Sequence, residues 1–359
     1  MKNILVQGYF VGNVGDDLFL KVLTEYFRDV SFTTFVDKKY LSIYKNFQNL
    51  TIITKSLSYK IINRCLYILK LPRLAKKLVQ GYDAYVEIGG SIFQQNKSKQ
   101  GVPLKRENIF ETGTPYYIIG SNFGPFLNEN YPKAYTEFFS KIAGITFRDT
   151  CSYNLFSNLK NVTFAPDVVF NLNSQKIGKH REEKPYITIV PIDLTNRKFS
   201  EEIRLEYERK LSELSQSFIK KGCLVKILAF NEYEGDLFAA NRIASFLDQK
   251  KVEVVNYTSL NELLPIIKGS DKLISTRFHS MILGWIFQIP QVVIKYSPKM
   301  DNEIRDVFPN QTNFSLNSFC KANINVLTRN MNTINSLELE KNKDRSADHF
   351  RQLESFLRN

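Results

Sequence analysis

The chain has 359 residues, of which 43% are apolar and 24% charged, the balance of an ordinary globular protein. A chain of this length is expected to form two domains of roughly 150 to 180 residues each. Its net charge of +13 indicates an anionic partner, such as nucleic acid, anionic lipid or a phosphorylated small molecule. Because zinc-ligand spacings and the motifs of RNA-binding modules are missing from the sequence, we expect no nucleic-acid partner.

Short β-rich runs alternate with helix-like runs along the first half of the chain. The apolar runs are NILVQG, SFTTFV, TIIT, AYVEIGG, YYIIGS, GITFRD and VTFAPD, with segments such as DDLFLKVLTEYFRDV between them. This alternation is typical of an open, mostly parallel sheet with helices on both faces. We therefore predict an N-terminal α/β domain over residues 1–172.

A second alternating region follows a polar linker. Residues 171–185, NLNSQKIGKHREEKP, have no apolar period. Strand-like runs then return, with helix-like runs between them, and predict a second α/β domain over residues 185–330. The charged residues 331–359 predict a C-terminal helix that packs back on the N-terminal domain. The predicted fold class is α/β, with two Rossmann-like domains facing a cleft.

Basic residues gather early in the chain without any intervening Asp or Glu. They alternate with apolar residues and are Lys55, Lys60, Arg64, Lys70, Arg73, Lys76 and Lys77. Such a segment suits an amphipathic helix on an anionic membrane surface, although a solvated basic helix packed on the sheet would explain it too.

Cysteine spacing and hydropathy indicate a cytoplasmic protein. The four cysteines are far apart and form no CxxC, which favours a reducing compartment without disulfides or a metal site. The first apolar run is too short for a signal peptide, and the longest, at residues 281–294, is shorter than the roughly 20 residues of a spanning helix. We expect a cytoplasmic location, with peripheral contact at the inner membrane face.

The loop GYFVGNVGDDL, residues 8–18, lies between the first strand and the first helix. Its glycines, Gly15 among them, let the backbone turn tightly and approach a ligand, and Asn13 is a candidate binding residue of the same loop, but the loop does not match GxGxxG. The adjacent carboxylates Asp16 and Asp17 suit sugar hydroxyls better than a pyrophosphate. A helix N-cap would explain Asp16 as well.

Further strand ends in the first half carry small or charged residues. VEIGGSIF contains Gly90 and Ser91, whose backbone N–H groups are candidates for the floor of the cleft. TFRDTCS places Arg148 and Asp149 at a strand-to-helix junction, and FAPDVVF does the same for Asp167. Capping explains both aspartates equally well.

The stretch STRFHSMILG, residues 275–284, stands out because it contains one of only three histidines. His180 and His349 lie in charged segments that we interpret as solvated. At a bend between a strand and a helix, Arg277 and His279 are expected to point to the same side, with Ser280 in the first turn. An arginine fork and a histidine suit a compact anion, and Lys299 in YSPK adds a third cation. A capped core histidine beside a surface arginine is the alternative.

Taken in order, these motifs resemble the polysaccharide pyruvyl transferase family. The resemblance spans about residues 5–300 and rests on residues 12–17, 89–91, 120–125, 147–149 with Ser152, 165–167 and 277–279. The first loop of the family more often reads Gly-Asp-Glu and the second Gly-Gly-Gly, where this chain has Asp17 and Ser91. These departures bear on which acceptor is used.

The resemblance implies a fold similar to the glycosyltransferase B type, with the acceptor on the N-terminal domain and the donor on the C-terminal domain. It implies that phosphoenolpyruvate, a co-substrate rather than a cofactor, forms a pyruvate ketal across two hydroxyls of a sugar in a surface glycan such as a capsule or exopolysaccharide. The Arg-x-His pair of the family's donor site falls on Arg277 and His279. We expect His279 to be the acid, Asp16 or Asp17 to act on the hydroxyls, and no metal to be required.

Two other interpretations remain open at this point. A nucleotide-sugar-dependent glycosyltransferase of the same fold would use a carboxylate such as Glu232 or Glu234 for the ribose. A non-catalytic glycan-binding or scaffold protein would be expected to have lost the cations Arg277, His279 and Lys299. We expect a glycan or lipid-linked saccharide as the acceptor.

Overall fold

The computed structural model describes the whole chain except residues 55–73, 96–100, 196 and 198. Most of the basic segment predicted to bind a membrane therefore lies outside the described residues. Of that segment, Lys76 is described, and its ammonium pairs with Glu111 at 2.8 Å. Among the residues that the structure describes, no helix is both long enough and apolar enough to cross a membrane.

The chain divides into two compact units whose segments alternate along the sequence. The first unit contains Met1–Val11, Leu18–Asn171 and Lys343–Asn359, and the second contains Gly12–Asp17 and Leu172–Asn342. The first turn of the first helix thus belongs to the second unit, and the C-terminal residues belong to the first.

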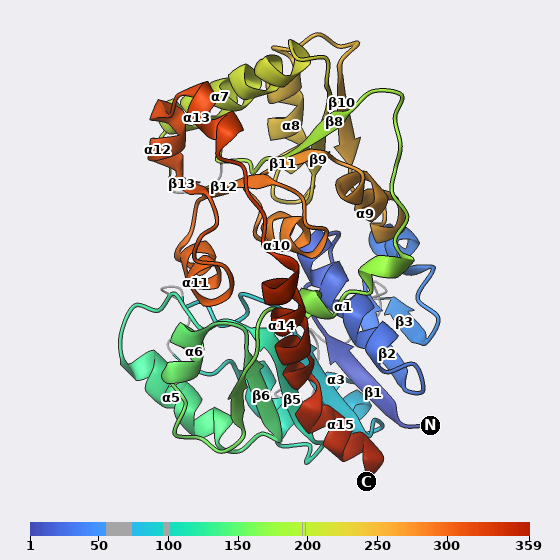
Figure 1. Cartoon of the computed structure of the whole chain (residues 1–359). Coiled ribbons are helices and arrows are strands. Elements are labelled where there is room, and N and C mark those ends of the chain that lie inside the picture. The colour runs from blue at the N-terminus through green and yellow to red at the C-terminus, as the bar shows by residue number, and fades with distance from the viewer. Residues whose placement is uncertain (55–73, 96–100, 196, 198) are drawn as a thin grey trace. The chain divides into compact units, whose positions relative to one another are not determined.

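The first unit is built on a parallel seven-stranded sheet of order β3-β2-β1-β4-β5-β6-β7 (Figure 1). Its strands are β1 (Asn3–Gln7), β2 (Ser31–Val36), β3 (Leu50–Thr54), β4 (Ala84–Ile88), β5 (Tyr116–Ser121), β6 (Gly144–Phe147) and β7 (Val162–Phe164). Its helices include α1 (Val14–Tyr26), α3 (Leu74–Val79), α4 (Leu104–Phe110), α5 (Asn130–Phe139) and α6 (Thr150–Asn154), with 3₁₀ turns at η1 (Lys38–Tyr44) and η2 (Val168–Asn171).

The C-terminal residues of the first unit form part of α14 (Ser336–Ser346), the 3₁₀ turn η4 (Ala347–His349) and α15 (Arg351–Arg358). They are fastened to β1 and β7 by the ammonium of Lys2, which donates to the Phe356 carbonyl, and by Gln352, which donates to the Asn161 carbonyl. A core cluster of the first unit is rich in aromatic rings, among them Phe93, Phe123, Phe139 and Phe147. Edge-to-face packing of such rings adds about 0.5–1.5 kcal/mol per pair beyond the buried area.

The second unit repeats the plan with a parallel six-stranded sheet of order β10-β9-β8-β11-β12-β13. Its strands are β8 (Tyr186–Val190), β9 (Leu224–Ala229), β10 (Val252–Asn256), β11 (Lys272–Ser275), β12 (Gln291–Lys295) and β13 (Asn313–Ser315). Its helices are α7 (Glu201–Ile219), α8 (Asp236–Ala244), α9 (Leu260–Lys268), α10 (Phe278–Ile286), α11 (Pro298–Val307), α12 (Leu316–Lys321) and α13 (Ile324–Arg329), with the 3₁₀ turn η3 (Ser174–Lys176) before β8.

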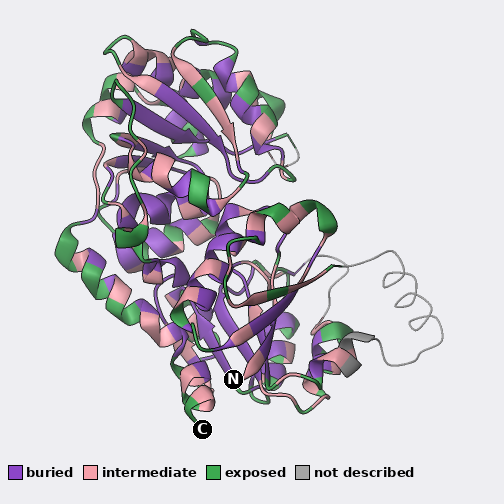
Figure 2. Ribbon diagram, turned by 90° about the vertical axis from the view of Figure 1, so that its right-hand side faces the viewer, coloured by how far each residue is buried: buried purple, intermediate pink, exposed green. Residues whose placement is uncertain are grey.

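Local sequence explains where these elements start and why they stay in place. The Ser200 and Ser259 hydroxyls cap α7 and α9 by each accepting the backbone N–H three residues later, as expected for serine before a helix. Every residue of β8 is buried, as its continuous apolar run YITIV requires in a parallel sheet covered on both faces. Figure 2 shows much of the strand ribbon in the colour of buried residues. The prediction of two Rossmann-like α/β halves is confirmed.

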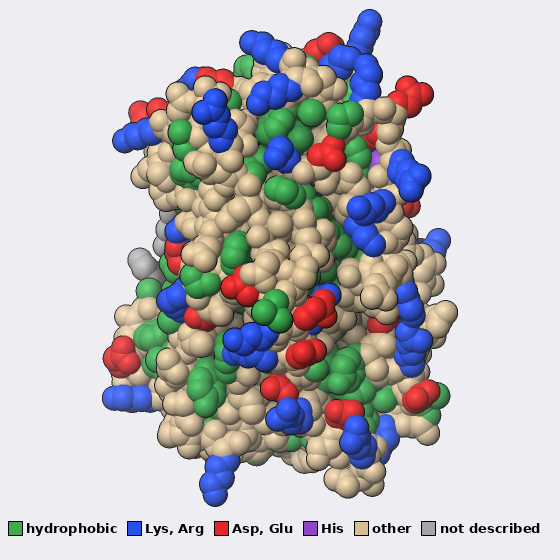
Figure 3. All heavy atoms as spheres, in the orientation of Figure 1, with side chains coloured by type: hydrophobic (Ala, Val, Ile, Leu, Met, Phe, Trp, Pro, Cys, Tyr) green, Lys and Arg blue, Asp and Glu red, His purple; other side chains and the backbone are tan. Residues whose placement is uncertain are grey.

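Basic side chains do not form a single patch on the face shown in Figure 3. There, lysines and arginines are spread over the surface and are interspersed with Asp and Glu. On that face, the surplus positive charge of the chain therefore does not mark one binding surface.

Candidate active site

The junction between β11 and α10 holds Arg277 and His279. Thr276 is fixed at the end of β11 because its backbone N–H donates to the Val190 carbonyl and its hydroxyl accepts from Tyr207 at 2.8 Å. Arg277 is the extended residue before α10, and its carbonyl accepts the Ser280 hydroxyl at 2.6 Å. The bend predicted between strand and helix is thus present, and the hydrogen bond from the Ser280 hydroxyl stabilises it.

The guanidinium of Arg277 is buried and engaged by two carboxylates of the second unit. Its Nε donates to Asp236 Oδ2 at 2.7 Å, its Nη2 donates to Asp236 Oδ1, and its Nη1 donates to Glu234 Oε2 at 2.6 Å. Burial alone would lower the pKa of Arg277, but these carboxylates more than offset it and raise the pKa. Glu234 was expected to contact a ribose only in the alternative glycosyltransferase interpretation, and Asp236 was not among the predicted site residues.

More cationic side chains surround Glu234. Its carboxylate also accepts from Arg197 Nη2, and the Arg197 guanidinium lies 5.0 Å from the centre of the Tyr296 ring. The Lys299 ammonium lies 5.6 Å from the Phe278 ring and 5.7 Å from the Tyr296 ring. Burial would raise the pKa of Tyr296, but Lys299, Arg277 and Arg197 lower it. The charges of Lys299, Arg277 and Arg197 therefore act together on the space beside Tyr296.

The segment Gly12–Asp17 lies against the end of β9. The Val14 N–H donates to the Phe230 carbonyl at 3.2 Å, and Asn13 forms a bridge with Asn231. The Asn13 side-chain oxygen accepts the Gly15 N–H at 3.0 Å. Asn13, rather than Asp16, thus caps the first turn of α1, which removes capping as the explanation for Asp16.

Gly15 and His279 touch. A Cβ built on Gly15 would lie 1.9 Å from His279 Nδ1, so only glycine allows the imidazole to occupy this place. His279 is half-buried, and its ring meets Phe278 edge to face at 5.1 Å between centres. Two motifs that stand 264 residues apart by their numbering therefore form one site.

The two aspartates of this segment have different surroundings. Asp17 is fully buried and its Oδ2 accepts the Tyr257 hydroxyl at 2.9 Å. Burial and the Asp17 charge raise the pKa of Tyr257, so the phenol keeps its proton and continues to donate it in a hydrogen bond to the Asp17 carboxylate. Asp16 is half-buried and is the better placed of the two to meet a ligand.

The first unit gathers a second polar cluster at the carboxyl ends of β4 to β7. Arg148 donates to Asp167 Oδ2 at 2.9 Å and to Asn122 Oδ1 at 2.7 Å, and the Ser91 hydroxyl donates to the same Asn122 oxygen at 3.1 Å. A Cβ on Gly90 would lie 2.7 Å from Arg148 Nη2. Asp149 caps α6 by accepting the Ser152 N–H at 2.8 Å, so its capping role is confirmed.

The predicted site residues therefore form two groups. The second unit contains Asn13, Gly15, Asp16, Asp17, Arg277, His279, Ser280 and Lys299, of which Gly15 and His279 are in contact. The first unit brings together Gly90, Ser91 and Arg148. Arg148 is only 2% exposed and already pairs with Asp167, so the arrangement of this second group is that of a buried scaffold.

One sequence interpretation is wrong. His349 was expected to be solvated because its neighbours are charged, yet it is 1% exposed and its Nε2 lies 2.8 Å from the Pro166 carbonyl. Burial, with a smaller contribution from the Arg148 charge, lowers the pKa of His349 to about 3. The helical period of the tail, which turns the apolar face inward, was the signal that this residue faces the core. His180 is partly exposed and pairs with Glu182.

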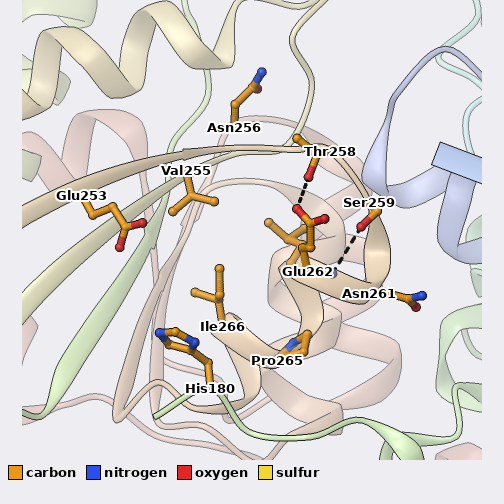
Figure 4. Close-up of a pocket in the computed structure, with 11 residues that line it drawn as sticks. His180, Glu253, Val255, Asn256, Thr258, Ser259, Asn261, Glu262, Pro265 and Ile266 are labelled. Carbon is orange, nitrogen blue, oxygen red and sulfur yellow. Dashed lines mark hydrogen bonds between the residues drawn. The ribbon is translucent and has the colours of Figure 1, made fainter. Parts of the chain in front are cut away.

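A pocket of the second unit lies beside α9 and the edge strand β10 (Figure 4). Its lining contains none of the predicted site residues, and Thr258 and Glu262 are bonded to each other across its wall. Within the described part of the chain, His, Cys, Asp and Glu side chains form no group of three or more that could hold a metal ion.

The architecture defines a two-unit protein of the glycosyltransferase B type. The chain is similar to Anabaena HepE solved with UDP and glucose, at 11% identity and a TM-score of 0.60, over 99% of this chain and 99% of that chain. It is also similar to the ADP-heptose lipopolysaccharide heptosyltransferase II of E. coli, at 10% identity and a TM-score of 0.50, over 96% of this chain and 98% of that chain. At these identities the likeness shows the fold alone.

The sequence model of the polysaccharide pyruvyl transferases matches residues 13–298, and the chain belongs to that family. The match includes both the Gly12–Asp17 segment from Asn13 onward and the Arg277–His279 junction. The chain is also 24% identical over 254 residues to the amylovoran biosynthesis protein AmsJ of Erwinia amylovora, over 64% of this chain. It spans 60% of the length of that relative.

Proposed function

We propose that the protein transfers the enolpyruvyl group of phosphoenolpyruvate to two hydroxyls of a sugar, forming a pyruvate ketal. The observation that carries the proposal is the contact of Gly15 with His279. This contact places the Gly12–Asp17 segment next to the Arg277–His279 junction within one unit. Family membership supports the reaction class, and the relation to AmsJ supports a role in exopolysaccharide or capsule synthesis.

The donor suits the cations around His279. Phosphoenolpyruvate carries a carboxylate and a phosphate, and Arg277 and Lys299 supply opposite charge. In the proposed step His279 gives a proton to the methylene carbon, and C2 becomes an oxocarbenium-like electrophile that the first sugar hydroxyl attacks. The C–O bond to phosphate then breaks, phosphate leaves with its bonding pair, and the second hydroxyl closes the ketal.

The acceptor is proposed to meet Asp16. Its half-buried carboxylate accepts hydrogen bonds from sugar hydroxyls and takes one of the two protons that they lose, replacing the one given up by His279, while the other leaves on the phosphate; Asp17 is kept in place by Tyr257. We propose a glycan or lipid-linked saccharide as acceptor, with the protein in the cytoplasm and in peripheral contact with the inner membrane face. No cofactor besides the co-substrate enters this scheme.

Mass spectrometry tests the reaction. Incubation of a glycan acceptor with phosphoenolpyruvate and protein is expected to add about 70 mass units, the increment of a pyruvate ketal. Phosphoenolpyruvate is also expected to raise the melting temperature, and Arg277→Ala to abolish the shift. If nucleotide sugars stabilise the protein and phosphoenolpyruvate does not, the glycosyltransferase interpretation replaces this one.

A further inference from the structure

Glu234 of the second unit lies between the guanidinium groups of two arginines. Its Oε2 accepts from Arg277 Nη1 at 2.6 Å and from Arg197 Nη2. The side chain is nevertheless 34% exposed, so solvent reaches the carboxylate while two guanidiniums hold it. A single carboxylate between two arginines mimics the group that the site is expected to recognise.

Asp236 has a different role from Glu234, although both contact Arg277. Asp236 is fully buried and takes the Nε and Nη2 edge of the guanidinium. It also accepts the backbone N–H groups of Asn231 at 3.0 Å and Asp193 at 3.4 Å. Asp236 thus fixes the plane of the guanidinium by itself, and only the Nη1 corner faces Glu234.

The electrostatics favour an anion at the place of Glu234. Burial would raise the pKa of Glu234, but Arg277, Arg197 and Lys299 lower it, so the carboxylate stays ionised near neutral pH. When its carboxylate is directed to solvent, the charges of Arg277, Arg197 and Lys299 act on the vacated place, and Asp236 continues to pair with Arg277. That surplus suits a ligand with more than one negative charge.

The backbone around Glu234 allows its side chain to turn outward. The residue lies in the turn between β9 and α8, next to the exposed Glu232 and Tyr233. Gly235 follows it in the left-handed region at φ 88°, which glycine adopts without strain. The Glu234 N–H is held by Asn231 Oδ1 at 3.1 Å, so the side chain can change rotamer while the backbone stays in place.

We propose that Glu234 is a displaceable internal carboxylate that the substrate's own carboxylate replaces between Arg197 and Arg277. The inference rests on the proposed donor, phosphoenolpyruvate, and adds Arg197 to its binding residues. Donor entry then exchanges one carboxylate for another at Arg277 Nη1, while the bonds of Arg277 to Asp236 persist. Glu234 therefore competes with the donor and keeps the empty site neutralised.

The test compares Glu234→Gln with Glu232→Gln, which removes the same charge from an exposed position of the same turn. Binding of phosphoenolpyruvate is measured by titration calorimetry, with the melting temperature of each variant as a check of folding. In the wild type, the Glu234 carboxylate competes with the donor for Arg197 and Arg277. Because Glu234→Gln removes this competitor and raises the fraction of binding-competent protein, the variant is expected to bind phosphoenolpyruvate about tenfold more tightly. Glu232→Gln is expected to match the wild type, and Arg197→Gln to bind more weakly.

The outcomes separate this inference from the proposed function. If Arg277→Ala loses phosphoenolpyruvate but Glu234→Gln binds it no more tightly than the wild type, Glu234 only braces Arg277 and the inference is overturned, while the function stands. If no variant binds phosphoenolpyruvate, the function fails. In that case, tighter binding of pyruvate or inorganic phosphate by Glu234→Gln would still support a displaceable carboxylate, and unchanged binding would overturn it.

Discussion

The backbone of Gly15 lies directly against the imidazole of His279, where a methyl group would overlap Nδ1. This contact limits the room available to the ring of the proposed acid. It also gives the glycine of the first loop a steric reason that does not depend on a ligand.

Gly15→Ala is expected to lower the rate of ketal formation by at least about tenfold, because the new Cβ displaces the ring of His279. The overlap is also expected to cost about 1–3 kcal/mol of stability, the usual range for overpacking. Steady-state kinetics and urea unfolding measure the two effects. Gly178→Ala is the control, since a Cβ there meets nothing within 4 Å. Unchanged kinetics in Gly15→Ala would show that the placement of the ring is irrelevant to the rate.

His279→Gln is expected to lower kcat about 10²- to 10⁴-fold, the usual contribution of a positioned general acid. Donor binding should change much less, because Arg277 and Lys299 remain. Single-turnover assays and titration calorimetry separate the two steps. His180→Gln, which alters a partly exposed histidine of the same unit, should behave like the wild type. A loss of binding equal to the loss of rate would argue against an acid role.

Asp167→Ala is expected to destabilise the protein by about 3–5 kcal/mol, because it leaves the buried guanidinium of Arg148 without its carboxylate. Urea unfolding provides the measurement. The exposed pair of Lys141 and Glu137 offers a comparison, and Glu137→Ala should leave the unfolding midpoint unchanged. Equal midpoints for both variants would mean that the buried pair contributes little.

His349 is expected to make the protein sensitive to acid. Its pKa is lowered to about 3 in the folded state, from 6.5 for an unperturbed histidine. The unfolded state therefore binds more protons between these values, and stability falls as the pH drops below about 6.5 toward 3. The slope attributable to this residue is up to about 1.4 kcal/mol per pH unit. Denaturant unfolding from pH 7 to pH 4 should show a shallower loss in His349→Gln, and parallel curves would contradict the assignment.

The sequence predicted the fold and the family because both depend on local patterns. Runs such as YITIV and the bend before Phe278 are encoded by adjacent residues, and the predicted α/β class is confirmed. The ion pairs of Arg277 could not be predicted in the same way, since Asp236 and Glu234 lie 41 and 43 residues earlier. Local sequence patterns do not show which side chains far apart in the sequence will pair in the folded protein.

The surroundings of individual residues could not be predicted from local sequence for the same reason. Charged neighbours suggested a solvated His349, yet the contacts that bury it come from residues such as Pro166, 183 positions away. Asp16 and Asp17 could not be distinguished from sequence because only the fold places Tyr257 beside one of them.

The alternating assignment of segments to the two units has a consequence for synthesis. When residues 1–171 have emerged from the ribosome, all seven strands of the first sheet have been synthesised. Residues 343–359, which belong to the same unit, have not yet been made. The first unit is therefore incomplete until residues 172–342 have been translated. Until then, the surfaces that Phe350 and Phe356 cover in the finished protein are exposed. Splitting the gene at residue 172 would yield two fragments, each lacking a piece carried by the other.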